Sequence, residues 1–81
     1  MKKKFFSYKI IRTLTIGDVH FHIGVSKIEK HRYATFFHRD GDKNYAWIRF
    51  FDYLFDAEKD IVDRAYREIG TLELNMQRRN E

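Results

Sequence analysis

The sequence predicts an α+β fold in which a four-stranded antiparallel meander is followed by one long C-terminal helix packed on one face of the sheet. Apolar and polar residues alternate from Val19 to Ser26, as they do in a strand with one buried face. The preceding Gly17-Asp18 pair has glycine first, which a type II′ hairpin turn favours. After residue 56, apolar residues recur at helical spacing instead.

Four segments rich in strand-forming residues are expected to be strands, at about residues 5–16, 19–27, 33–38 and 45–51. In the first of them the apolar residues share one parity, which only Arg12 interrupts. A two-residue turn would place Ile16 opposite Val19 and Leu14 opposite Phe21. Both apolar rows would then lie on the same face of the sheet.

The helix is expected over about residues 56–78, with Asp56 as its N-cap. The solvent-exposed side of the helix is expected to carry two pairs of opposite charge four residues apart, Asp60 with Arg64 and Asp63 with Arg67. One apolar stripe would face the sheet, made of Ile61, Val62, Ala65, Ile69, Leu72 and Met76.

An alternative ends the helix at Gly70 and makes residues 71–76 a short fifth strand, because Leu72, Leu74 and Met76 also alternate. The strong helix formers in this segment favour the continuous helix.

Composition indicates one domain that is not stabilised by disulfides or by cysteine-based zinc sites. The 81 residues include no cysteine, which excludes disulfides and thiolate chemistry and favours the cytoplasm. No run of 18 apolar residues is present, so a membrane partner is not expected. Charge is uneven, with a balance of +7 in residues 1–49 and −3 in residues 50–81. A basic half of this kind is a candidate surface for phosphates or an acidic protein.

One helix covers one sheet face, so the other face is the candidate binding surface. By parity this uncovered face should present Lys9, Ile11 and Thr13 from the first strand and two histidines from the second. Cations beside aromatic rings are what single-stranded nucleic acid binding uses, although the same rings could instead pack in a homodimer. With Arg39 and Lys43 from the following loop, the candidate site is Lys9, His20, His22, Tyr33, Phe37, Arg39, Lys43, Trp47 and Arg49.

Catalytic and metal motifs are weak. His20 and His22 share a strand face and could chelate a metal if further ligands from His31, His38, Asp40 or Asp42 came near. The run from Asp40 to Asn44 begins like a calcium loop, but Tyr45 stands where glycine is required and Phe51 where the glutamate belongs. No cofactor is expected. A third hypothesis is a small RNase-like or metal-dependent enzyme that uses His38, Arg39 and Lys43.

The predicted strand and helix order is similar to that of a family of dimeric transcriptional coactivators that bind single-stranded DNA. This resemblance is one of topology, and no residue is carried over from it. In size and character the chain also resembles small proteins of phages and mobile elements. Some of those inhibit host defence complexes, as anti-CRISPR proteins do, and would act in the host cytoplasm. A non-enzymatic nucleic-acid-binding protein is therefore expected first, and an inhibitor or adaptor docking on a host protein or nucleoprotein complex second.

Overall fold

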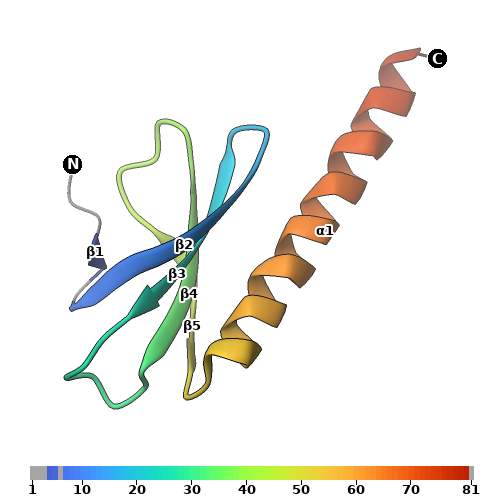
Figure 1. Cartoon of the computed structure of the whole chain (residues 1–81). Coiled ribbons are helices and arrows are strands. Elements are labelled where there is room, and N and C mark those ends of the chain that lie inside the picture. The colour runs from blue at the N-terminus through green and yellow to red at the C-terminus, as the bar shows by residue number, and fades with distance from the viewer. Residues whose placement is uncertain (1–3, 6, 81) are drawn as a thin grey trace.

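The computed structural model describes the backbone of residues 4–5 and 7–80 and the side chains of residues 7–71. Five strands form one antiparallel sheet in chain order, and one helix follows (Figure 1). The elements are β1 (Lys4–Phe5), β2 (Tyr8–Ile16), β3 (Val19–Val25), β4 (Tyr33–Arg39), β5 (Ala46–Phe51) and α1 (Leu54–Asn80). The predicted α+β order is confirmed. The one addition is the two-residue β1, which pairs with β2 at the sheet edge and divides the first expected strand.

The β2–β3 hairpin has the predicted register. Ile16 pairs with Val19 and Leu14 with Phe21. Gly17 has φ of 61°, the positive value that the first position of a type II′ turn requires and that a residue with a Cβ rarely adopts.

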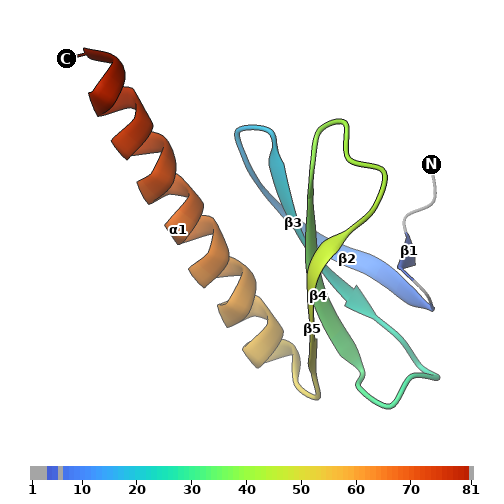
Figure 2. The same cartoon turned by 180° about the vertical axis from the view of Figure 1, so that it is seen from behind.

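Helix α1 begins at Leu54, two residues before the expected start, so Asp56 lies in the first turn and is not the N-cap. The helix runs through Gly70 without a break, and the alternative strand at 71–76 is wrong. Figures 1 and 2 show its first turns close to the sheet and its last turns extending past it. No helix in the described part of the chain has the length and apolar composition needed to cross a membrane.

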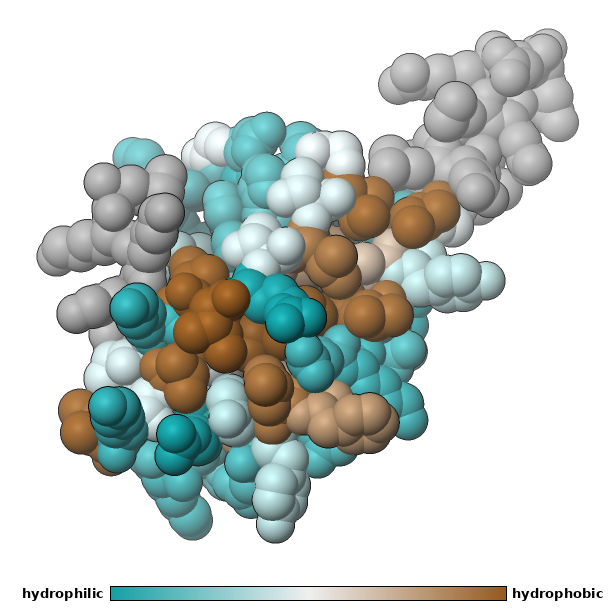
Figure 3. Space-filling view, in the orientation of Figure 1, coloured by the Kyte–Doolittle hydropathy of each residue, from teal (hydrophilic) through white to brown (hydrophobic). Residues whose placement is uncertain are grey.

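The main core lies between the sheet and α1. Val19, Phe21 and Ile23 of β3 are buried against residues from three turns of the helix, Ala57, Ile61 and Ala65. Apolar side chains form a broken band from the strands to the helix on the side shown in Figure 3. Of the expected helical stripe, Ile61 and Ala65 contribute to this core, whereas Val62 and Ile69 are exposed. The side chains of Leu72 and Met76 lie outside the described residues.

A second core lies on the other face of the sheet, and a bulge in β2 creates it. The register shifts between Ile10 and Arg12, so Ile11 is an extra residue and the parity of the strand reverses there. Tyr8 and Ile10 therefore point away from α1, although the continuous alternation in the sequence had placed them on its side. Tyr8 is buried with Ala34 and Phe36, and Ile10 and Tyr45 pack against them.

Candidate nucleic-acid interface

The expected site residues divide between the two faces of the sheet. His20 and His22 lie on the face opposite α1, as predicted. Tyr33 and Phe37 pair with Val25 and Phe21 of the main core row, and therefore lie on the helix side. Since directly opposed residues share a face, Arg49, which pairs with Thr35, lies there too. The prediction that these three residues lie on the uncovered face is wrong, because the parity of β4 and β5 is the reverse of the one expected.

Four other expected residues lie away from the open face. Lys9 is exposed and pairs with Val25 on the helix side of the sheet. Arg39 pairs with Val19, also on the helix side, whereas Lys43 is exposed in the β4–β5 loop. Trp47 lies where the β4–β5 register shifts, and it lines a groove on the helix side.

This groove, here called the arginine groove, lies between the sheet and the middle of α1 and has a volume of about 230 Å³. Sheet residues form one wall and helix residues the other. Four arginines and one glutamate are among its lining residues, so its walls are predominantly basic. The lining comprises Phe21, Phe37, Arg39, Trp47, Arg49, Arg64, Arg67, Glu68 and Thr71.

A buried carboxylate positions two of the four guanidinium groups. Asp60 on α1 has one oxygen 2.9 Å from Nη1 of Arg49 and the other 3.0 Å from Nε of Arg64. The hydroxyl of Thr35 donates a hydrogen bond to the second oxygen at 2.6 Å. Because Asp60 is buried and contacts β4, β5 and α1, both arginines are held in fixed positions in the groove.

Arg64 has donor capacity that the described residues do not use. Its side chain is 11% exposed, and neither Nη1 nor Nη2 has a hydrogen-bond partner in the described structure. Burial lowers the pKa of the Arg64 guanidinium, and Arg49 and Arg67 lower it further, while Asp60 opposes the shift. Arginine stays charged through such shifts, so Arg64 is a buried cation with two unpaired donor groups beside the groove.

The other two arginines of the groove have no close ion pair with a described residue. Arg39 lies 3.6 Å from Asp18 and 3.9 Å from Glu68, and its side chain is half exposed. Arg67 has no ion pair with any described residue, and the expected Asp63–Arg67 pair does not form, whereas the Asp60–Arg64 pair does. A ligand with negative charge could therefore reach two guanidinium groups without breaking a close ion pair.

Trp47 supplies an exposed aromatic surface at the groove. It is 74% exposed and has φ of 54°, the one positive φ among the described non-glycine residues. A bulky side chain in this left-handed region costs roughly 1–2 kcal/mol. Strained residues of this kind concentrate at functional sites, where the strain holds a side chain in a working position.

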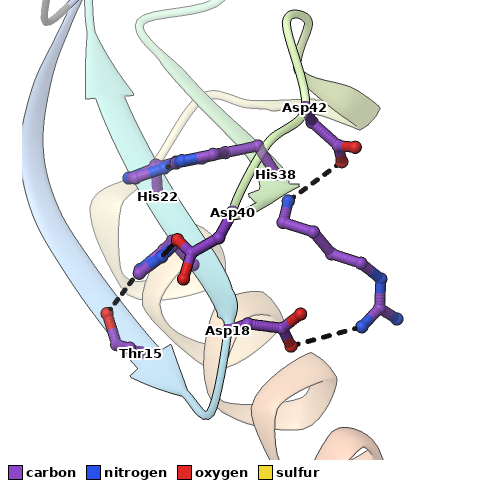
Figure 4. Close-up of polar contacts among 8 residues, drawn as sticks. Thr15, Asp18, His22, His38, Asp40 and Asp42 are labelled. Atoms are coloured by element: carbon purple, nitrogen blue, oxygen red, sulfur yellow. Dashed lines mark hydrogen bonds and ion pairs between the residues drawn. The ribbon is translucent and has the colours of Figure 1, made fainter.

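The open face holds a cluster of three histidines, shown in Figure 4. The rings of His22 and His38 are stacked with centroids 5.0 Å apart, and those of His20 and His38 with centroids 4.8 Å apart. Nε2 of His22 lies 2.9 Å from Nδ1 of His38. Nε2 of His20 lies 2.7 Å from a carboxylate oxygen of Asp40, and its Nδ1 lies 2.9 Å from the hydroxyl of Thr15.

His22 is the buried member of this histidine cluster. Its pKa is lowered to about 4, chiefly by burial and in addition by the neighbouring His38 and His20. Its Nδ1 lies 2.8 Å from the hydroxyl of Thr13, so both ring nitrogens are engaged within the sheet. The cluster therefore extends the second core and does not present a row of free imidazoles.

The alternative in which His20 and His22 chelate a metal is not supported by this geometry. Each ring nitrogen of the two residues already has a partner, and no group of three or more metal-ligating side chains occurs within the described residues. Asp42 of the calcium-like loop accepts a hydrogen bond from the backbone N–H of Arg39 at 3.0 Å, which is a turn contact.

Sequence reasoning missed Arg64 and Arg67 as site residues, because both had been placed in exposed ion pairs on the helix. The spacing held a signal nonetheless, since residues 60, 64, 67 and 71 recur at intervals of four and three and so lie on one side of a helix. Comparison with family models, curated proteins and solved structures finds no match to this chain.

Proposed function

We propose that this protein binds single-stranded nucleic acid in the arginine groove, between the β4–β5 pair and α1. The observation that carries the proposal is the combination of an exposed, strained Trp47 with four guanidinium groups in one groove. Single-strand binding uses the same two elements, because aromatic rings stack on bases and arginines contact the phosphates.

The size of the groove favours binding of a single nucleotide unit of a longer strand. Its volume of about 230 Å³ is below the roughly 300–1,000 Å³ typical of pockets that enclose a drug-sized ligand. A single nucleotide, with its base on Trp47 and its phosphate near Arg39 and Arg67, suits a groove of this kind. A duplex is disfavoured, since its bases are already paired and stacked and cannot reach an exposed indole.

An acidic peptide is the competing ligand class. Its carboxylates could pair with the arginines. They offer no flat π surface for Trp47, so the strained indole would have no role. The aromatic component therefore favours a nucleobase.

Trp47 is the only tryptophan in the chain, and its fluorescence reports directly on the groove. The test titrates the protein with oligo(dT) and oligo(U) at several salt concentrations. Stacking should quench the fluorescence, and the logarithm of the binding constant should fall linearly with the logarithm of the salt concentration.

Two variants with equal charge loss separate groove binding from general attraction. Arg39→Gln removes a groove cation, whereas Arg32→Gln removes an exposed arginine that does not line the groove. Arg39→Gln should weaken binding by about tenfold and lower the salt slope by about 0.7, and Arg32→Gln should have a smaller effect. Equal losses in both variants, an absence of quenching, or quenching by a polyglutamate peptide alone would each overturn the proposal.

A further inference from the structure

One side of α1, next to the side that packs on the sheet, carries an apolar stripe that remains exposed. Phe55, Val62, Tyr66 and Ile69 are 73%, 56%, 76% and 39% exposed. Their spacing of seven, four and three residues confines them to a narrow strip about 21 Å long, which lies beside the residues of α1 that pack in the main core. This set is here called the outer stripe.

Charged residues of alternating sign lie along one flank of the outer stripe. In chain order they are Asp56, Lys59, Asp63 and Arg67, at intervals of three, four and four residues, so they share one side of the helix. None of the four side chains has a hydrogen bond or ion pair with another described residue. A hollow of about 350 Å³, bounded also by Phe51, lies beside the first three.

We infer that the outer stripe binds the same stripe of a second copy of this chain, with the two α1 helices antiparallel about a two-fold axis near Val62. In this arrangement Val62 meets its own counterpart, and Phe55 meets Ile69 of the second copy. Antiparallel helices bring matching flanks together, so Asp56 faces Arg67 and Lys59 faces Asp63, each pair being formed twice.

The charge pattern and the apolar pattern place the two-fold axis within one residue of each other. The midpoint of Phe55 and Ile69 is position 62, and the midpoints of the two charge pairs are 61.5 for Asp56 with Arg67 and 61 for Lys59 with Asp63. The row of charges on one helix is therefore complementary to the same row on a second helix that runs in the opposite direction. In a parallel pair, residues of equal number lie side by side along the two helices. The alternating charges of the flank would then not pair with opposite charges of the second copy.

The area of the stripe sets the expected affinity. Its four side chains expose on the order of 400–500 Å², so two copies bury about 1,000 Å² in total. This is near the lower limit for a specific interface, and we expect a micromolar dissociation constant. Arg67 also lines the arginine groove, so in this dimer it is shared between Asp56 of the second copy and the proposed nucleic-acid site.

Sedimentation equilibrium from 1 to 500 μM measures the oligomeric state of the full chain. A monomer–dimer equilibrium in the micromolar range is expected, and Tyr66→Arg should weaken it at least tenfold. Ile28→Arg is the matched control, because Ile28 is 81% exposed but lies in the β3–β4 loop. A protein that remains monomeric throughout, or equal effects of the two variants, would overturn the inference.

Single cysteines test the axis, since the chain has no native cysteine. Val62→Cys should oxidise to a disulfide-linked dimer, whereas Phe55→Cys should not cross-link with itself but should do so when mixed with Ile69→Cys. Self-cross-linking of Phe55→Cys would indicate a parallel pair and overturn the arrangement. Circular dichroism of each variant confirms that the helix is retained.

The charge pairs give an independent test. Lys59→Asp places two acids opposite each other twice in the dimer and should weaken it about tenfold. The double variant Lys59→Asp with Asp63→Lys reverses both signs and should restore the wild-type affinity. Failure of the double variant to recover dimerisation would contradict the proposed register.

Discussion

Asp60 lies 2.9 Å from Arg49, and this ion pair joins α1 to the last strand of the sheet. The same carboxylate lies 3.0 Å from Arg64 on the next turn of the helix. Both walls of the arginine groove are therefore fixed by one buried acid. The relationship connects the stability of the fold to the geometry of the proposed binding site.

Replacing Asp60 by asparagine should destabilise the protein by about 3 kcal/mol. Removing one member of a buried ion pair leaves the other charge without compensation, and here two guanidinium groups lose their partner. Urea unfolding followed by circular dichroism measures the change. Asp63→Asn, in the next turn but exposed and unpaired, should change stability by less than about 0.5 kcal/mol. Similar effects of the two substitutions would argue against the role assigned to Asp60.

The strained backbone at Trp47 predicts an unusual order of stabilities. Trp47→Gly and Trp47→Ala both remove the indole, but alanine retains the steric cost of φ near 54° and glycine does not. The glycine variant should therefore be more stable than the alanine variant by about 1 kcal/mol. Both should lose the proposed nucleic-acid binding to the same extent, as measured by anisotropy of a labelled oligonucleotide. An alanine variant as stable as the glycine variant would show that the position is unstrained.

His22 predicts a loss of stability in mild acid. Its folded-state pKa of about 4 lies below its ordinary value of 6.5, chiefly because the ring is buried. Between these two values the unfolded chain binds more protons at this residue, so stability falls as the pH falls from 6.5 to 4 and levels off below that. The contribution reaches about 3 kcal/mol.

The measurement compares urea unfolding at pH 7 and pH 4.5 for the wild type and for His22→Phe. The variant should lose much of the pH dependence. His31→Phe replaces a histidine outside the cluster, which pairs with Asp52, and should retain that dependence. Equal pH dependence of the wild type and His22→Phe would assign the acid response to other groups.

Two glycines should respond in opposite ways to alanine. A Cβ at Gly24 would lie 2.8 Å from Cβ of Tyr8 and 3.3 Å from the ring of Phe36, so Gly24→Ala should destabilise the second core by about 1–3 kcal/mol. A Cβ at Gly70 meets nothing within 4 Å, and Gly70→Ala in the helix should stabilise by about 1 kcal/mol. Thermal unfolding measures both. A neutral Gly24→Ala would show that Tyr8 and Phe36 do not approach Gly24 this closely.

Local patterns in the sequence were sufficient to predict the β2–β3 hairpin and the helix. A two-residue turn sets the register, so the pairing of Leu14 with Phe21 followed directly. The continuity of α1 through Gly70 followed from the strong helix formers on both sides of that residue.

The faces of β4 and β5 could not be predicted in the same way. Loop 26–32 is long enough to permit either parity of β4, and tertiary packing of Phe37 with Phe21 decides between them. The register shift near Trp47 has no local signal either. As a result, the sequence indicated cations and aromatic rings, the kinds of residue that line the proposed binding site, but placed most of them on the wrong side of the sheet.

The extra residue at Ile11 makes the length of β2 a constraint on the whole molecule. Tyr8 and Ile10 cover the back of the sheet because one position is inserted between them and the hairpin. Inserting or deleting one residue between positions 8 and 12 would move the side chains of that segment to the opposite face of the sheet. The same change in loop 40–45 would alter only the length of the hairpin loop. Related sequences should therefore vary in length at the loop and keep a fixed count through the first half of β2.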